Sequence, residues 1–290
     1  MTPATASDLS RRKLLAIGIG AVGAIAMRTT AAQQSDAYTF AVIGTDYRTP
    51  QDPELSDVLM VSRVNVEAGT VRTLSIPRDL YVEIPGHGYE KINAAFSIAV
   101  KSDPDQNWEV GAASTVATIE HNFGLQIDGV AQTNMQVFPQ LVDAVGGVVV
   151  DNPYFLTDES FGDYPAGEIT LTGEEAIRFC RSRNMDGDGG RVMRQHLVLG
   201  GMLAKLQSPA MLTRVPQLID TLSGEVVNTN ISTAIQARLI AMLPTLSGDN
   251  LAFTNIEDQL SPGYTSGGAW IYQGDWSTLP GYVQSWLAGP

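Results

Sequence analysis

Arginine is concentrated in one segment of this sequence, RFCRSRNMDGDGGRVMRQ, residues 178–195. It contains five arginines, Arg178, Arg181, Arg183, Arg191 and Arg194, although the whole chain has only 18 Lys and Arg against 31 Asp and Glu and a formal net charge of -13. A guanidinium offers a planar fork of N–H donors that matches phosphate and carboxylate oxygens. The segment is therefore a candidate anion site in an otherwise acidic protein.

Three shorter groups of polar residues follow apolar runs elsewhere in the chain: GTDYR at 44–48, SD at 56–57 and PRD at 77–79. Ligand sites in α/β proteins lie at strand ends, so these groups can converge if their strands are neighbours. Asp46 and Asp57 would supply the hard oxygen ligands that Mg²⁺ prefers. Carboxylates together with several arginines suit a pyrophosphate.

A purely structural interpretation of the arginines is equally open from the residues alone. Arg178 and Glu174 are one helical turn apart and can form an ion pair on a helix face. Arg181 and Arg183 can pair with Asp186 and Asp188, in which case the segment is only a turn.

Composition excludes several other classes of protein. The acidic balance argues against a nucleic-acid partner, which requires a broad basic surface. A single cysteine, Cys180, excludes an internal disulfide framework and a cysteine zinc site, and the three histidines show no metal-binding spacing. The sequence has neither a GxxxxGK[ST] phosphate loop nor a GxSxG nucleophile elbow.

The N-terminus is typical of an exported protein. Ser10, Arg11, Arg12 and Lys13 precede an apolar run from Leu14 to Met27, which is shorter than the roughly 20 residues that cross a bilayer. We interpret residues 1–35 as a twin-arginine-like export signal or, alternatively, a signal anchor on the outer face of the cytoplasmic membrane. Residues 36–290 then form a single extracytoplasmic domain.

Apolar periodicity predicts alternating strands and helices across this domain. Residues 38–46 read as a buried strand, and the residues around Glu67–Gly69 join two arms of a hairpin. Helices are predicted at 92–100, 114–122, 135–144, 191–207, 210–222 and 232–246, and a capping box of Thr172 and Glu175 starts another at 173. The alternation indicates an α/β layered sheet. The Gly-, Ser- and aromatic-rich tail after residue 250 is expected to wrap the domain edge.

The order of motifs resembles the LytR-CpsA-Psr family. The motifs are VIGTDYR, SDVLMVSRVN, VRTLSIPRDLYVEIPGHGYEKINAAF, LVDAVGGVVV, LTGEEAIRFCRSRN and DGDGGRVMRQ, between residues 42 and 195. The resemblance implies an α/β/α sandwich with a central mixed sheet and a hydrophobic lipid tunnel. It also implies a Mg²⁺-dependent phosphotransferase that moves a glycopolymer from a polyisoprenyl pyrophosphate carrier to a cell-wall acceptor, usually peptidoglycan, at the membrane surface.

Transferred residue by residue, the resemblance assigns roles to ten positions. It gives Asp46 and Asp57 to the metal; Arg78, Asp79, Arg183 and Arg191 to catalysis; and Arg181, Arg194, Gln195 and Arg48 to substrate binding. Asp79 would orient Arg78. Two positions depart from the family pattern: Leu55 stands where arginine is common, and His196 where a second glutamine is common.

Alternatives remain both for the predicted lipid tunnel and for the predicted catalytic activity. The helical faces that could line a tunnel carry Ala95, Phe96, Val137, Phe138, Leu199 and Leu203, although apolar residues at helical spacing usually belong to a core. Leu55 leaves a non-catalytic polyisoprenyl-glycan binding protein as one alternative function. A polyisoprenyl pyrophosphate phosphatase, which transfers the phosphate to water, is another.

Overall fold

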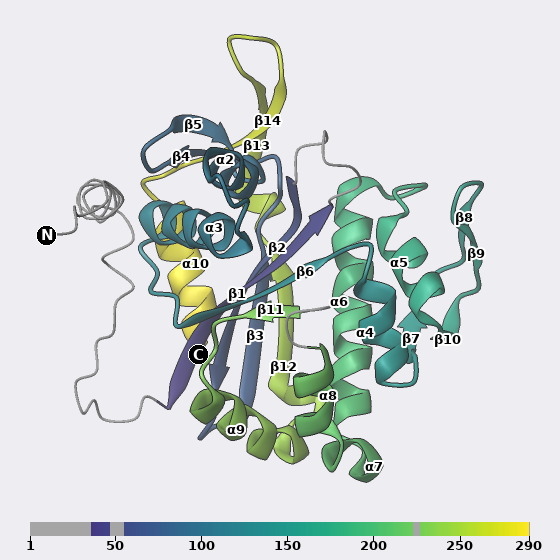
Figure 1. Cartoon of the computed structure of the whole chain (residues 1–290). Coiled ribbons are helices and arrows are strands. Elements are labelled where there is room, and N and C mark those ends of the chain that lie inside the picture. The colour runs from purple at the N-terminus through teal and green to yellow at the C-terminus, as the bar shows by residue number, and fades with distance from the viewer. Residues whose placement is uncertain (1–35, 47–54, 223–226, 290) are drawn as a thin grey trace, which may run out of the picture. The chain divides into compact units, whose positions relative to one another are not determined.

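The computed structural model describes residues 36–46, 55–222 and 227–289, and the chain from Asp36 onward forms one compact unit (Figure 1). Its centre is a six-stranded sheet with the order β11-β6-β1-β2-β3-β12. The strands are β1 (Ala37–Asp46), β2 (Leu55–Asn65), β3 (Thr70–Ser75), β6 (Gly129–Asn134), β11 (Val227–Thr229) and β12 (Leu251–Asn255). Because β1 pairs antiparallel with β2 but parallel with β6, the sheet is mixed, as predicted.

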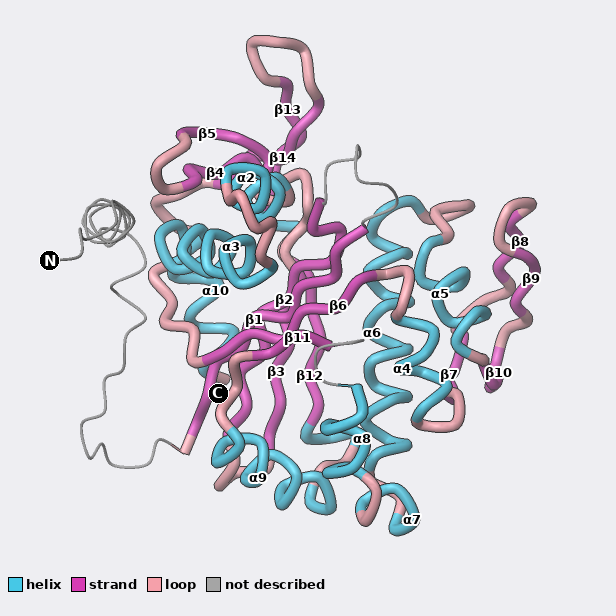
Figure 2. The backbone as a smooth tube through the Cα atoms, viewed as in Figure 1, coloured by secondary structure: helices cyan, strands magenta, loops and turns pink. Residues whose placement is uncertain are grey.

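Three helices cover one face of the sheet: α2 (Ala94–Ser102), α3 (Trp108–Phe123) and α10 (Leu279–Ala288) (Figure 2). Alternate strand residues such as Ile43, Val61 and Leu74 point to this face and pack in one buried cluster with Phe96 and Phe123. The period of two along a strand separates these residues from their neighbours, which face the opposite layer.

The opposite face carries α4 (Phe138–Ala144), α5 (Gly173–Arg181), α6 (Gly187–Leu206), α8 (Val215–Leu222) and α9 (Thr233–Met242), with the short α7 (Pro209–Leu212) beside them. Tyr38, Phe40 and Val64 of the sheet pack there against Met242 and Leu243. Helices on both faces of a central mixed sheet confirm the predicted α/β/α sandwich.

Smaller strand pairs surround the sandwich. They are β4 (Tyr81–Ile84) with β5 (Gly88–Lys91), β7 (Val148–Asn152) with β10 (Gly167–Leu171), β8 (Leu156–Asp158) with β9 (Gly162–Tyr164), and β13 (Leu260–Tyr264) with β14 (Trp270–Gly274). Three 3-10 turns occupy Leu243–Thr245, Gly248–Asn250 and Glu257–Gln259. None of the described helices is long and apolar enough to cross a membrane.

Several local predictions are confirmed. The hairpin of β2 and β3 turns at Gly69, which adopts φ +64°. Thr172 and Glu175 form both hydrogen bonds of the capping box that starts α5. Arg178 lies on the exposed side of that helix, 3.8 Å from Glu174, while Cys180 is buried.

Two local predictions are wrong. Helix α6 begins at Gly187, not near Arg191, so Gly189 and Gly190 belong to its first turn. Gly190 has a steric reason there, because a Cβ at this position would lie 1.8 Å from the Asp186 carboxyl carbon. The tail after residue 250 does more than wrap the edge: β12 pairs in parallel with β3, and α10 packs into the core.

Candidate active site

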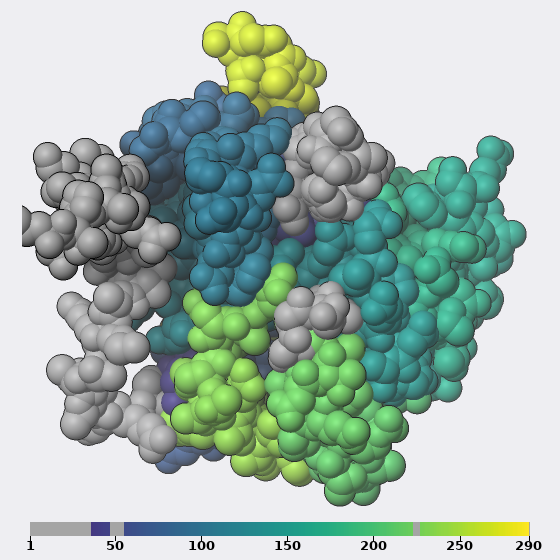
Figure 3. All heavy atoms as spheres, in the orientation of Figure 1, coloured from purple at the N-terminus to yellow at the C-terminus, as the bar shows by residue number. Residues whose placement is uncertain are grey.

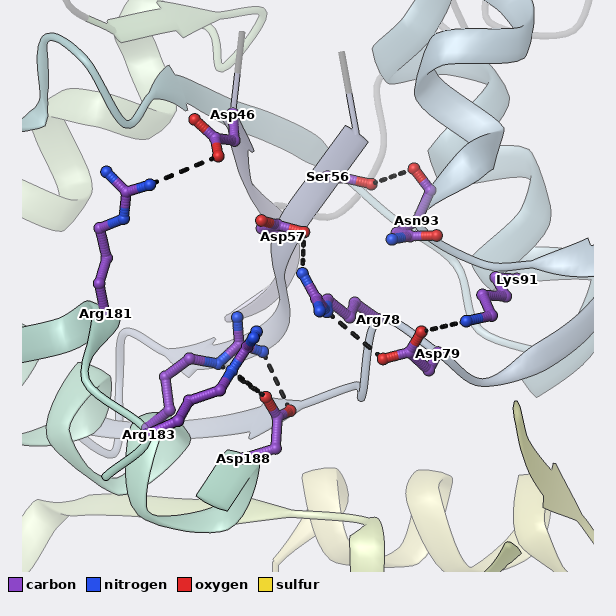
Figure 4. A network of polar contacts seen from close by, with 11 residues as sticks. Asp46, Ser56, Asp57, Arg78, Asp79, Lys91, Asn93, Arg181, Arg183 and Asp188 are labelled. Carbon is purple, nitrogen blue, oxygen red and sulfur yellow. Dashed lines mark hydrogen bonds and ion pairs between the residues drawn. The ribbon is translucent and has the colours of Figure 1, made fainter. Parts of the chain in front are cut away.

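Five of the predicted site residues line one polar cleft with a volume of about 670 Å³: Asp57, Arg78, Arg181, Arg183 and Arg191. They come from β2, the residues after β3, the end of α5, the turn that follows it, and α6. Figure 4 shows the side chains of Asp57, Arg78, Arg181 and Arg183 around a common space. Segments more than a hundred residues apart in the sequence therefore converge, as their positions at element ends predicted.

A β-bulge places Asp57 at this cleft. Gly44 pairs with Val58 and Thr45 pairs with Ser56, so Asp57 is the extra residue of β2. Without the bulge, strict alternation would send the Asp57 side chain to the opposite face from Val58; a bulge re-aims it. Ser56 fixes the irregularity, since its backbone N–H and its Oγ both donate to the Asn93 carbonyl oxygen, at 3.1 and 3.2 Å.

Arg78 is held by carboxylates on both sides. Its Nη1 lies 2.7 Å from Asp57 Oδ1 and its Nε 3.3 Å from Asp79 Oδ2, and Asp79 also accepts from Lys91 Nζ at 2.6 Å. Burial acts to lower the pKa of Arg78, but Asp57 and Asp79 outweigh it and the pKa is raised. Asp79 contacts Arg78 Nε, and its orienting role stays a prediction.

Asp188 joins two more arginines. Its Oδ1 lies 3.1 Å from Arg183 Nε and 3.0 Å from Arg191 Nε. Burial lowers the pKa of Arg191, and the positive charges of Arg183 and Arg78 lower it further. An arginine whose pKa is lowered by burial and by neighbouring cations lies in a site where a bound anion would stabilise its charged form. The structural interpretation is thus correct for the Arg183–Asp188 pair but not for Arg181, which lies 3.7 Å from Asp46 Oδ2.

Arg194 requires a correction, because its side chain has no exposed surface and does not reach the cleft. Its guanidinium donates to the carbonyl oxygens of Phe179 and Ser182 at 3.0 and 2.5 Å and to both carboxylate oxygens of Asp186 at 2.5 and 3.0 Å. All of these partners belong to the end of α5 and the turn before α6. Arg194 therefore holds in place the turn that carries Arg183, and is a positioning residue instead of a substrate contact.

Gln195 faces a different environment from the arginines. It is 8% exposed, lines an apolar cavity, and its Nε2 has no hydrogen-bond partner within the described part of the chain. His196 packs on the far side of α6, where it hydrogen-bonds to Ser75 Oγ at 2.7 Å and stacks on Phe253. The departure at His196 is therefore outside the cleft.

The other two positions are Leu55 and Arg48. Leu55 is paired with Asp46 across the strands, and Arg48 lies outside the described residues.

Two apolar cavities continue from the polar cleft along α6. Met135 and Cys180 line both the cleft and a cavity of about 100 Å³, and Met202 lines both that cavity and a larger one of about 300 Å³ between β6, β11, α4, α6, α8 and α9. Of the predicted tunnel residues, Phe138 and Leu199 line the first cavity. The prediction is wrong for Ala95 and Phe96, which are core residues on the opposite face of the sheet, and neither Val137 nor Leu203 lines either cavity.

Sequence reasoning missed three polar residues beside the cleft. Lys91 is the second partner of Asp79, and the hydroxyl of Tyr272 donates to Glu257. The backbone N–H of Tyr272 also donates to the Asp79 carbonyl oxygen at 2.9 Å. Lys91 lies in β5, within the same motif as Asp79, but only the return of the C-terminal hairpin to the PRD segment brings Tyr272 to the site.

The α/β/α sandwich thus places an arginine-lined polar cleft beside apolar cavities, a combination that suits an anionic group attached to an apolar chain. The profile of the LytR_cpsA_psr family matches residues 19–281. The chain belongs to the LytR-CpsA-Psr family.

Named relatives agree with this membership. A protein of Oceanobacillus iheyensis named polyisoprenyl-teichoic acid--peptidoglycan teichoic acid transferase TagU is 32% identical over 83% of this chain and 72% of its own length. A protein of the same name from Bacillus anthracis is 35% identical, and the match spans 69% of this chain but only 62% of that protein.

Solved structures share the fold. TagV of B. subtilis superposes with a TM-score of 0.71 at 26% identity, covering 88% of this chain and 99% of TagV. TagT bound to the ligand named LIIa-WTA superposes with a TM-score of 0.68 at 24% identity, over 90% of this chain and 95% of TagT.

Proposed function

We propose that this protein transfers a glycopolymer, with its phosphate, from a polyisoprenyl pyrophosphate carrier to a hydroxyl of a cell-wall acceptor, peptidoglycan, outside the cytoplasmic membrane. One observation carries the proposal: a cleft lined by Arg78, Arg181, Arg183 and Arg191 adjoins an apolar cavity at Met135 and Cys180. A lipid pyrophosphate has this same junction of charge and hydrocarbon. The names of the relatives as teichoic acid transferases support the same reaction.

The reaction follows from where the charges lie. The acceptor hydroxyl attacks the phosphorus that bears the glycan, and the bond from this phosphorus to the bridging oxygen breaks. Polyisoprenyl phosphate leaves with the electron pair, and the hydroxyl proton passes to the leaving phosphate or to solvent. Arg183 and Arg191 are oriented by Asp188, and Arg78 by Asp57 and Asp79, so their donors need little reorganisation when charge builds on the leaving phosphate. The apolar cavities would hold the first part of the lipid.

Mg²⁺ fits the donor set of Asp46 and Asp57. The bulge brings Asp57 to the cleft face next to the end of β1, where Asp46 lies, and carboxylates plus substrate phosphates are common ligands of this ion. Asp46 and Asp57 would supply two ligands, and oxygens of the substrate phosphates would supply others, as is common for this ion. When bound, the ion would neutralise part of the pyrophosphate charge.

The place of action depends on residues 1–35, which lie outside the described part of the chain. Their charged and apolar order supports export by a twin-arginine-like signal, or anchoring, and so a location at the outer surface of the membrane.

A labelled polyisoprenyl-pyrophosphate glycan tests the reaction. We expect the purified protein to release lipid phosphate only when a peptidoglycan acceptor and Mg²⁺ are supplied. Arg183→Ala should abolish release, whereas Arg178→Ala, which removes an arginine on the exposed side of α5, should retain it. Release without acceptor would identify a phosphatase, and tight binding without release would identify a binding protein; either result overturns the proposal.

A further inference from the structure

The hairpin of β13 and β14 presents an aromatic face that the reaction above does not use. Residues 259–274, QLSPGYTSGGAWIYQG, contain no charged side chain, although the chain as a whole carries a formal charge of -13. Figure 3 shows the hairpin, in yellow, projecting beyond the body of the molecule. A projecting segment that carries exposed aromatic rings is a candidate for contact with a partner.

The strand register gathers the rings on one face. Tyr264 pairs with Trp270 and Pro262 pairs with Tyr272, and paired residues of antiparallel strands share a face. Tyr264 is 70% exposed and Trp270 38% exposed, and the Trp270 and Tyr272 ring centroids are 4.7 Å apart. Ile271, which points the other way, is buried. We call Tyr264, Trp270 and Tyr272 the aromatic ladder.

The ladder begins at the rim of the active-site cleft. The Tyr272 backbone donates to the Asp79 carbonyl oxygen at 2.9 Å, and Asp79 directly follows Arg78, which lines the cleft. The Tyr272 hydroxyl donates to Glu257, whose Oε2 lies close to the first turn of α6 at Gly189. From there the ladder leads outward to Tyr264 near the hairpin tip.

We propose that the aromatic ladder binds a neutral sugar segment of the acceptor glycan strand and directs its hydroxyl to the cleft. This inference rests on the proposed function. The apolar C–H face of a sugar ring stacks on a flat aromatic ring, and the Tyr and Trp polar atoms remain available to sugar hydroxyls. A hairpin without charge neither attracts nor repels such an uncharged partner.

A lipid surface fits the same hairpin less well. Tyr and Trp also occur at membrane interfaces, but anionic headgroups attract Lys and Arg, and residues 259–274 contain neither. The Asp residues that flank this run, Asp258 and Asp275, add negative charge at its base. Charge therefore favours the neutral glycan.

Co-sedimentation with peptidoglycan sacculi stripped of teichoic acid tests the inference. We expect the double variant Tyr264→Ala, Trp270→Ala to bind sacculi at least roughly tenfold more weakly, since each lost ring should weaken affinity by roughly three- to tenfold. The double variant Tyr264→Phe, Trp270→Phe keeps both rings and should bind within about threefold of the unaltered protein. Phe155→Ala removes an exposed ring elsewhere, whose 52% exposure lies between those of Tyr264 and Trp270, and should have no effect.

Two results would overturn the inference. The double alanine variant could sediment with sacculi as the unaltered protein does, or it could lose binding to anionic phospholipid vesicles while its binding to sacculi stays intact. The transfer assay separates the two proposals. With lipid-linked donor, the double alanine variant should show a raised KM for acceptor and an unchanged kcat. If the ladder variants weaken sacculus binding but the unaltered protein releases no lipid phosphate, the proposed function alone is refuted. If the protein catalyses transfer but the ladder variants bind sacculi as well as the unaltered protein does, this inference alone is refuted.

Discussion

Arg194→Met separates residues that position the cleft from residues that bind in it. The buried guanidinium makes four hydrogen bonds, two to backbone carbonyls and two to the Asp186 carboxylate. Methionine keeps most of the aliphatic volume but leaves these acceptors without their donors. Breaking a buried ion pair by removing one partner costs about 3–5 kcal/mol, so we expect a loss of stability in that range.

The prediction can be measured by equilibrium unfolding in urea together with thermal melts. For a domain of this size, each kcal/mol corresponds to a shift of about 2–4 °C, so the Tm should fall by roughly 10 °C. Arg183→Ala is the matched control, because Arg183 is 43% exposed and pairs only with Asp188 in the described structure. It should change stability by less than about 1 kcal/mol while abolishing activity. An Arg194→Met variant as stable as the unaltered protein would refute the positioning role.

Three further predictions address the cavities, the cysteine and the histidine. Met202 lies at the junction of the two apolar cavities. In a direct binding titration, Met202→Trp should weaken the binding of a long-chain polyisoprenyl pyrophosphate but not that of a short-chain analogue. An equal loss of affinity for both ligands would contradict a continuous lipid path. Burial raises the pKa of the Cys180 thiol to about 12. Iodoacetamide should therefore leave this thiol unmodified in the native protein near neutral pH and modify it in guanidinium chloride. Rapid labelling of the native protein would show that the thiol is accessible and contradict its burial. Burial lowers the pKa of His196 to about 4 from its ordinary value of 6.5, so the unfolded chain binds the extra proton first and the free energy of unfolding should decrease as pH falls through this window. His196→Gln should lose that part of the pH dependence, and an unchanged slope would count against a buried neutral ring.

The sandwich was predictable because local signals agreed with one another. Short-range patterns in the sequence match the folded protein. They include the alternating strands, the turn at Gly69 and the capping box of Thr172 and Glu175. The start of α6 was not predictable in the same way. Gly189 and Gly190 have low helix propensity, and the carboxylate of Asp186, which leaves no room for a Cβ at position 190, is a tertiary contact that the sequence does not reveal.

The site was predictable in its residue types but not in its individual contacts. The converging arginines follow from motif order. Arg191 and Arg194 are both buried residues of α6, but only Arg191 lines the cleft, whereas Arg194 is hydrogen-bonded to Asp186 and to backbone carbonyls. The bulge at Asp57 depends on pairing across strands, and the partner of Arg181 is a strand residue, Asp46, instead of a nearby aspartate. Such pairings join residues that are distant in the sequence, so sequence periodicity cannot predict them.

Photo-crosslinking can show on which face of the sheet the lipid binds. A polyisoprenyl pyrophosphate with a photoreactive group in its first isoprene units should label residues of the apolar cavity beside the cleft, such as Phe138 and Leu199, and inorganic pyrophosphate should compete with this labelling. Labelling concentrated on α2, α3 or α10, on the other face of the sheet, would contradict the account.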